Sequence, residues 1–195
     1  MADTLLHVTE SSAVDIPLPP TPTSQREMRL SHGRTIRIDS PENAIDGVRL
    51  RSLSAHCDHR GWLIELYRED ELPAEDRPVM AYVSETLPGI ARGPHEHVDQ
   101  TDYFAFLGPG EFMLYLWDAR PASPTFGRRM RVAVGQSNRT CVVVPPGVVH
   151  AYKNVGDVPG WVFNGPNRLY AGRRHCSPVD EIRHEQQADS PYRLD

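Results

Sequence analysis

From Ile45 onward, the chain is divided into short β-rich runs, each ended by glycine, proline or other turn residues. Several of these runs have the length of one strand, and helical periodicity is nearly absent. The runs are GVRLRSL, GWLIELY, VMAYVS, YFAFLG, FMLYLWD, MRVAVG, TCVVVPP and WVFNG. Many short strands with this punctuation predict an all-β fold, as an antiparallel sandwich, a jelly roll or a small barrel.

The segment before these runs has a different composition. Residues 1–44 include DIPLPPTPTSQREMRLSHG, whose prolines and small polar residues disfavour the interior of a helix or a sheet. We therefore expect an irregular N-terminal arm over residues 1–44, suited to wrapping a neighbouring subunit, and one domain over residues 45–195. A chain of 195 residues is long enough for one substantial core but short for two full domains.

Charge and hydropathy exclude two classes of partner. A net charge of −5 and a pI near 6.0 give no basic field that would attract a nucleic acid. No apolar run approaches the roughly 20 residues that span a bilayer, and the start of the chain lacks the pattern of a secretion signal. We therefore expect a cytoplasmic protein without a membrane partner. The cysteines Cys57, Cys141 and Cys176 lack the paired spacing of a zinc or redox motif, which indicates free thiols.

The stretch ARGPHEHVDQTDYF places two histidines one residue apart. On a strand, His95 and His97 would share one face and could converge on a single point. Downstream, PPGVVHAYKN has the spacing of the second sequence motif of the cupin superfamily, which the first stretch also resembles. This resemblance implies a cupin jelly roll with His95, His97, Asp102 and His150 as one cluster. Such a ligand set suits zinc, iron, nickel or manganese. The competing interpretation is that the histidines lie on the surface and PPG is an ordinary turn.

A narrower resemblance covers roughly residues 45–195. The opening DGVRLRSLSAHCDHRGWLIELYREDEL, with Asp58, Arg60, Gly61 and Glu65, is similar to that of the dTDP-4-dehydrorhamnose 3,5-epimerases. The Arg-Gly-x-His signature of that family then occurs at Arg92–His95. WDARPASPTFGR, VPPGVVHAY and the closing DEIRHEQQADSPYRLD follow in the order of the family.

The resemblance implies proton abstraction beside the carbonyl of a nucleotide-linked keto-sugar, with no cofactor required. It places His95 as the general base, because an imidazole titrates near working pH. Glu185 is the candidate carboxylate partner of this base, and Tyr170 matches a tyrosine of the family. Four further residues fall at substrate-binding positions: Arg60, Glu65, Arg92 and His150. The two arginines suit a diphosphate, since each presents a planar fork of donors. A homodimer is implied as well.

Three departures from the family pattern bear on mechanism. On this resemblance, Asp102 takes the position of the lysine of the family, and Phe163 or Asn164 takes that of its proton-donating tyrosine. The glutamine and asparagine that surround the nucleotide fall near Met80 and Tyr82, which puts thymidine in doubt. A divalent ion on the histidine cluster would supply the lost positive charge. In that case Glu185, Tyr170 or a metal-bound hydroxide would have to act as the base.

Two other function classes follow from these departures. One is a metal-dependent cupin isomerase or dioxygenase, for which the histidines and Asp102 would be ligands. The other is a sugar-nucleotide binding module that has kept the pocket but lost the acid-base groups. Metal content distinguishes the first from the epimerase, and deuterium exchange at the sugar distinguishes the second.

Overall fold

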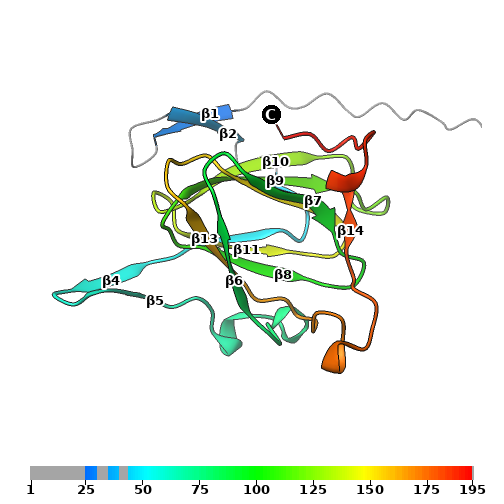
Figure 1. The fold of residues 1–195 in the computed structure, drawn as a ribbon, viewed down its shortest axis with the longest axis horizontal. Coiled ribbons are helices and arrows are strands. Elements are labelled where there is room, and N and C mark those ends of the chain that lie inside the picture. The colour runs from blue at the N-terminus through cyan, green and yellow to red at the C-terminus, as the bar shows by residue number, and fades with distance from the viewer. Residues whose placement is uncertain (1–24, 30–34, 40–43, 195) are drawn as a thin grey trace, which may run out of the picture.

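The computed structural model describes residues 25–29, 35–39 and 44–194. Two five-stranded antiparallel sheets face one another and form a sandwich (Figure 1). The first sheet has the order β10 (Arg129–Gly135), β9 (Glu111–Asp118), β12 (Val148–Asn154), β7 (Ala91–Glu96) and β14 (Ile182–Arg183). The second has the order β3 (Arg49–Ser52), β11 (Thr140–Val144), β8 (Asp102–Phe106), β13 (Gly160–Asn164) and β6 (Tyr82–Thr86). The predicted all-β jelly-roll fold is confirmed.

The described residues contain no α-helix, and their only helical elements are single 3-10 turns. These turns are η2 (Glu69–Glu71), η3 (Ala74–Asp76), η4 (Arg173–His175) and η5 (His184–Gln186). Consequently, this part of the chain has no helix that could cross a membrane.

The central strand β9 shows how the sequence builds the core. All eight of its residues are buried, and alternate side chains point to opposite faces of the sheet. Phe112, Leu114 and Leu116 face the second sheet and are completely buried in the main core. The other face packs Met113, Tyr115 and Trp117 against the C-terminal segment with Tyr192 and Leu194. Burying a side chain such as Leu114 contributes about 1.5–3 kcal/mol, so this strand anchors both layers.

Two hairpins lie outside the sandwich. β4 (Ala55–Asp58) and β5 (Gly61–Ile64) form a hairpin that projects away from the two sheets (Figure 1). β1 (Gln25–Arg29) pairs with β2 (Thr35–Asp39), which lies beside β10. The prediction of an irregular arm therefore does not hold for these ten residues. No proline lies between Pro22 and Pro41, and the QREMR and TIRID segments between them contain no residue that would interrupt pairing. The rest of the arm, apart from Ala44, lies outside the described residues.

Strand pairing brings the histidine motifs together. β7 and β12 are neighbours, with His95 opposite His150. The register shifts between His150 and Tyr152, which marks an irregularity of the kind that re-aims side chains beside active sites. Gly93 is required here, because a Cβ at this position would lie 2.6 Å from the carbonyl oxygen of His150. β8, in the opposite sheet, begins with Asp102 and so presents a carboxylate to the same region.

Candidate active site

A pocket of about 790 Å³ opens between β6, β7 and the C-terminal segment around β14. Its wall includes His95 and His97 from the first stretch, together with the aromatic residues Phe104 and Tyr152. A depression of this size is typical of a small-molecule site, where apolar walls surround a few polar groups.

The four predicted cluster residues converge beside this pocket. His95, His97, Asp102 and His150 each offer one ligand atom, and these atoms all lie within 4.8 Å of one another. The rings of His95 and His150 meet edge to face, with centroids 4.4 Å apart. Asp102 and His150 are each only 1 % exposed, His97 is 8 % exposed, and His95 is half-buried on the pocket wall. The sequence pattern therefore predicted a real spatial cluster.

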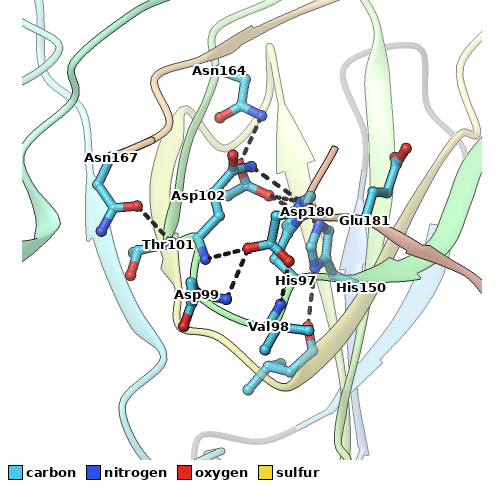
Figure 2. Close-up of polar contacts among 12 residues, drawn as sticks. His97, Val98, Asp99, Thr101, Asp102, His150, Asn164, Asn167, Asp180 and Glu181 are labelled. Carbon is cyan, nitrogen blue, oxygen red and sulfur yellow. Dashed lines mark hydrogen bonds and ion pairs between the residues drawn. The ribbon is translucent and has the colours of Figure 1, made fainter. Parts of the chain in front are cut away.

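Asp102 is the carboxylate at the centre of the cluster (Figure 2). Its Oδ1 accepts hydrogen bonds from Gln100 Nε2 at 3.0 Å and from Asn164 Nδ2 at 3.1 Å. Its Oδ2 lies 3.1 Å from His97 Nε2 and 3.2 Å from His150 Nε2. Burial would raise the pKa of Asp102, but the two histidines outweigh burial and hold it well below its usual range. Asp102 is therefore an anion beneath the pocket.

Backbone carbonyls fix two of the three imidazoles. His97 Nδ1 donates to the carbonyl oxygen of Asp180, and His150 Nδ1 donates to that of Val148 at 3.0 Å. Both rings consequently direct Nε2 toward Asp102. Asp180 also fixes the adjoining loop, since its carboxylate accepts the backbone N–H groups of Val98, Asp99 and Gln100 (Figure 2).

The third imidazole is in a different state. Burial, together with charge on His150 and His97, lowers the pKa of His95 to about 2, so this ring is neutral over the physiological range. In contrast, the pKa of His97 is raised, because its contacts with Asp102 outweigh the effect of burial. In the part of the chain that the structure describes, the ring nitrogens of His95 have no hydrogen-bond partner. His95 is thus a neutral imidazole facing the pocket.

The structure brings some of the other predicted residues to the pocket and leaves two outside it. Arg92, Tyr170 and Glu185 line the pocket wall. Glu185 is exposed and, within the described segments, has no hydrogen bond to His95. Arg60 lies at the tip of the β4–β5 hairpin, paired with Asp58, and Glu65 lies just beyond β5, 3.8 Å from Arg68. Neither Arg60 nor Glu65 lines the pocket of its own chain.

Sequence reasoning did not identify several pocket residues. Arg168 and Arg183 add positive charge to the wall, and Tyr82 adds a phenol. The Tyr82 hydroxyl accepts a hydrogen bond from Asn164 Nδ2 at 2.7 Å, and burial raises its pKa to about 12. For Tyr82 a signal existed, because the resemblance had already placed this position near the ligand. Arg183 reaches the pocket because β14 pairs with β7, a long-range contact that no local pattern indicates.

Comparison with known proteins agrees with this geometry. The family model for dTDP-4-dehydrorhamnose 3,5-epimerase matches residues 42–171. The probable low-salt glycan biosynthesis epimerase Agl13 of Haloferax volcanii is 35% identical over 127 residues, which are 65% of this chain and 81% of the relative. The spore coat polysaccharide biosynthesis protein SpsL of Bacillus subtilis is 34% identical over 115 residues, covering 59% of this chain and 75% of SpsL.

Solved structures give the same result for the fold. A dTDP sugar isomerase from Desulfovibrio desulfuricans G20 superposes with a TM-score of 0.65 and 27% identity, covering 76% of this chain and 91% of the isomerase. ChmJ, a 3'-monoepimerase from Streptomyces bikiniensis solved with dTDP-quinovose, has a TM-score of 0.62 at 22% identity, covering 78% of this chain and 81% of ChmJ. The fold, the histidine site and these matches together establish that the chain belongs to the dTDP-4-dehydrorhamnose 3,5-epimerase family and is a sugar-nucleotide epimerase-like cupin.

Proposed function

We propose that this protein inverts a carbon atom next to the keto group of a nucleotide-linked deoxysugar, with His95 as the general base. The observation that carries this proposal is the half-buried imidazole of His95 on the pocket wall, whose ring nitrogens have no hydrogen-bond partner among the described residues. Burial lowers the pKa of His95, which keeps the ring unprotonated but also makes it a weak base, so catalysis near neutral pH requires bound substrate to raise this pKa. A carbonyl acidifies the neighbouring C–H bond. His95 can therefore take that proton, leaving an enolate, and the carbon regains a proton on its opposite face.

Arginine side chains on the pocket wall support a diphosphate-linked substrate. Arg92, Arg168 and Arg183 line the pocket from three separate segments of the chain. The same wall carries carboxylates, and Arg183 is paired with Glu181 at 2.7 Å, so Arg92 and Arg168 are the stronger candidates for phosphate contacts. Arg92 is held by Thr86 Oγ1 at 3.0 Å and by the carbonyl oxygen of Glu85 at 2.7 Å, so its guanidinium is oriented before ligand binds. Such preorganised forks suit phosphate oxygens. ChmJ, which shares the fold, was solved with a dTDP-linked sugar, and we propose the same class of ligand here.

The returning proton requires an acid on the opposite face of the sugar. We assign this role to Tyr82, whose hydroxyl accepts a hydrogen bond from Asn164. The pKa of about 12 keeps this phenol protonated until the enolate forms. Tyr170, which the resemblance favoured, also lines the pocket and is similarly exposed, at 54 % against 47 % for Tyr82, but its ring contacts His175 edge to face. It remains the alternative donor.

We further propose a homodimer in which the β4–β5 hairpin reaches the partner. This hairpin projects from the sandwich and carries Trp62 and Leu63, which are 53 % and 65 % exposed. Covering these apolar side chains with a second copy would remove them from water. Arg60, at the tip of the same hairpin, would then enter the pocket of the partner subunit as the substrate-binding residue that the resemblance implies.

Solvent deuterium exchange tests the proposed reaction. A dTDP-linked 4-keto-6-deoxysugar, and its UDP analogue, would be incubated with the protein in D2O, and loss of the proton signals beside the carbonyl would be followed by NMR. We expect exchange that falls about 10²–10⁴-fold in a His95→Asn variant. Calorimetric binding of the nucleotide sugar to this variant verifies that the pocket is intact. Binding without exchange in the unaltered protein would contradict the proposal and favour a binding module.

A further inference from the structure

Three polar side chains form a row across the second sheet. Asn164, on β13, lies opposite Tyr82 of β6 on one side and opposite Phe104 of β8 on the other. Residues that face each other across antiparallel strands share one face of the sheet, and so does a residue two positions along the same strand. Asp102, two residues before Phe104, therefore points to this face as well. The row leads from the buried carboxylate of Asp102, through Asn164, to Tyr82 on the pocket wall.

Asp102 fixes the orientation of the Asn164 side-chain amide. The Nδ2 atom of Asn164 lies 3.1 Å from Asp102 Oδ1 (Figure 2) and 2.7 Å from the hydroxyl oxygen of Tyr82. A reversed amide would place an oxygen at 3.1 Å from a carboxylate oxygen, with no hydrogen between the two acceptors. Its NH2 group would then take the place of Oδ1, which is buried and has no partner among the described residues. The negative charge of Asp102 thus turns the NH2 group toward both neighbours.

This orientation determines which hydrogen Tyr82 can offer. An amide has two N–H donors, and here one is directed to Asp102 and the other to Tyr82. The phenol oxygen is consequently the acceptor in this contact, and its own hydrogen takes no part in it. Elsewhere in the described segments the Tyr82 hydroxyl has no hydrogen-bond partner, and its side chain lines the pocket. The phenolic hydrogen is therefore available for donation into the pocket.

The same contact supports Tyr82 after it has lost its proton. Burial and the charge of Asp102 raise the pKa of Tyr82, whereas the hydrogen bond from Asn164 lowers it, because it favours the charged form of the phenol. A phenolate at this position is thus opposed by Asp102 through space and stabilised by Asn164 through direct contact. Asn164 separates Tyr82 from the carboxylate that would otherwise disfavour the proton transfer.

We propose that Asn164 is a positioning residue for the return of the proton: anchored by Asp102, it leaves the hydrogen of Tyr82 to the substrate and stabilises the phenolate that remains. This inference rests on the proposed function, in which Tyr82 is the acid. In the transfer, the O–H bond of Tyr82 breaks and a C–H bond forms at the enolate carbon, while the keto group is restored. The phenolate then regains a proton from solvent, to which His95 releases the proton it has taken.

The hydrogen bond itself can be tested without an activity assay. The side-chain amide of Asn164 gives a pair of proton resonances in nitrogen–proton correlation NMR spectra, identified by their disappearance in Asn164→Asp. Tyr82→Phe removes the acceptor but keeps the aromatic ring and its ring current. We expect this variant to move one resonance of the pair upfield and to leave the other, which is bonded to Asp102, in place. If both resonances keep their positions, Asn164 does not donate to Tyr82 and the proposal is overturned.

A double-mutant cycle tests whether Asn164 acts through Tyr82. In Asn164→Asp, an oxygen replaces the NH2 group, and the Tyr82 hydroxyl donates its hydrogen to that oxygen. We expect the ratio of net epimerisation to deuterium exchange to fall about tenfold or more, whereas exchange driven by His95 changes only a few-fold. In the Tyr82→Phe background, the same substitution should leave the ratio unchanged. An equal fall in both backgrounds would mean that Asn164 acts on another group, contrary to the proposal.

Asn167→Asp is the matched control for burying a carboxylate in this segment. Asn167 is 8 % exposed, and its Nδ2 donates to the backbone carbonyl of Glu75 at 2.6 Å, so the change does not touch Tyr82. The ratio in this control should equal that of the unaltered protein. Should Asn164→Asp fail to fold, Asn164→Leu, which removes the donor without adding charge, takes its place in the spectra and in the cycle, with the same expected dependence on Tyr82.

The outcomes separate this inference from the proposed function. Epimerisation that survives Tyr82→Phe would overturn the role of Asn164 and leave the epimerase function intact. If the unaltered protein exchanges no deuterium into either nucleotide sugar, the proposed function fails, and the catalytic role of Asn164 fails with it. The NMR spectra then still decide whether Asp102 and Asn164 direct the Tyr82 hydroxyl as the structure indicates.

Discussion

Asp118 illustrates how one buried carboxylate stabilises this sandwich. Its two oxygens accept hydrogen bonds from the side chains of Arg120, Ser123 and Thr125, which close the turn between β9 and β10. Burial would raise the pKa of Asp118, but these donors outweigh it and lower the pKa to about 2. A folded-state pKa below the unfolded value of about 3.9 stabilises the protein above pH 4, and this contribution is lost as the pH falls toward 2.

We therefore predict that Asp118→Asn lowers the free energy of unfolding by about 2–3 kcal/mol at pH 7, because a shift of about two pKa units corresponds to this energy. Near pH 3 the difference between variant and unaltered protein should shrink. Urea denaturation followed by circular dichroism at both pH values measures it, with the exposed Asp157→Asn as control. An equal difference at pH 7 and pH 3 would mean that the carboxylate charge is not the cause.

Variants of the two tyrosines on the pocket wall test which of them donates the returning proton to the substrate carbon. If Tyr82 is the acid, Tyr82→Phe should lower net epimerisation about 10²-fold or more while His95 continues to exchange the substrate proton with solvent. Tyr170→Phe should change both rates only a few-fold. Product analysis by NMR and deuterium exchange, measured on the same samples, give the two rates. The opposite ranking of the variants would assign the role to Tyr170.

The C-terminal segment around β14 holds the loop after β7 in place beside the site. Asp180 receives three successive backbone N–H groups from the loop after β7, and its carbonyl oxygen receives His97 Nδ1. We predict that Asp180→Ala removes protection from hydrogen exchange at the amides of Val98, Asp99 and Gln100. The rate of deuterium exchange into substrate should fall about tenfold, because a mobile loop directly after β7 leaves the base on that strand less precisely positioned.

Mass spectrometry of peptides covering residues 97–102 measures the amide protection. Asp189→Ala, at an exposed position in the same C-terminal segment, is the control. If the loop stayed protected in Asp180→Ala while the enzyme slowed, the carboxylate would be acting on the substrate and not on the loop.

The elements also show what the sequence could predict. The strands followed from runs of β-forming residues, and the shared face of His95 and His97 followed from the two-residue repeat of a strand, which is a local signal. The convergence of this pair with His150 and Asp102 followed from the resemblance to the cupin motifs. The β1–β2 pairing, Arg183 and Asp180 were not found, since each depends on a contact between distant segments. Tyr82 was noticed only as a replacement, because nothing local reveals that Asn164 holds its hydroxyl.

For the whole molecule, the position of the β4–β5 hairpin determines whether an active site needs residues from one chain or from two. In a single chain, Arg60 does not line the pocket, whereas Arg92, Arg168 and Arg183 do. If Arg60 binds substrate, it does so in a second copy, and each active site then needs residues from two chains. Two-fold dimers are the commonest closed assemblies, and reciprocal exchange of a hairpin would be compatible with that symmetry.

Mixed dimers test this shared site. His95→Asn removes the base of its own pocket, and Arg60→Ala removes the hairpin arginine offered to the partner, so each variant alone should be nearly inactive. After the two are mixed and allowed to exchange subunits, about half of the dimers contain one of each, and one of their two sites is intact, which restores about a quarter of the unaltered activity. Sedimentation confirms that dimers form. Activity that stays at the average of the two parents would show that Arg60 does not serve the pocket of a partner, since no recombination of chains could then repair the site.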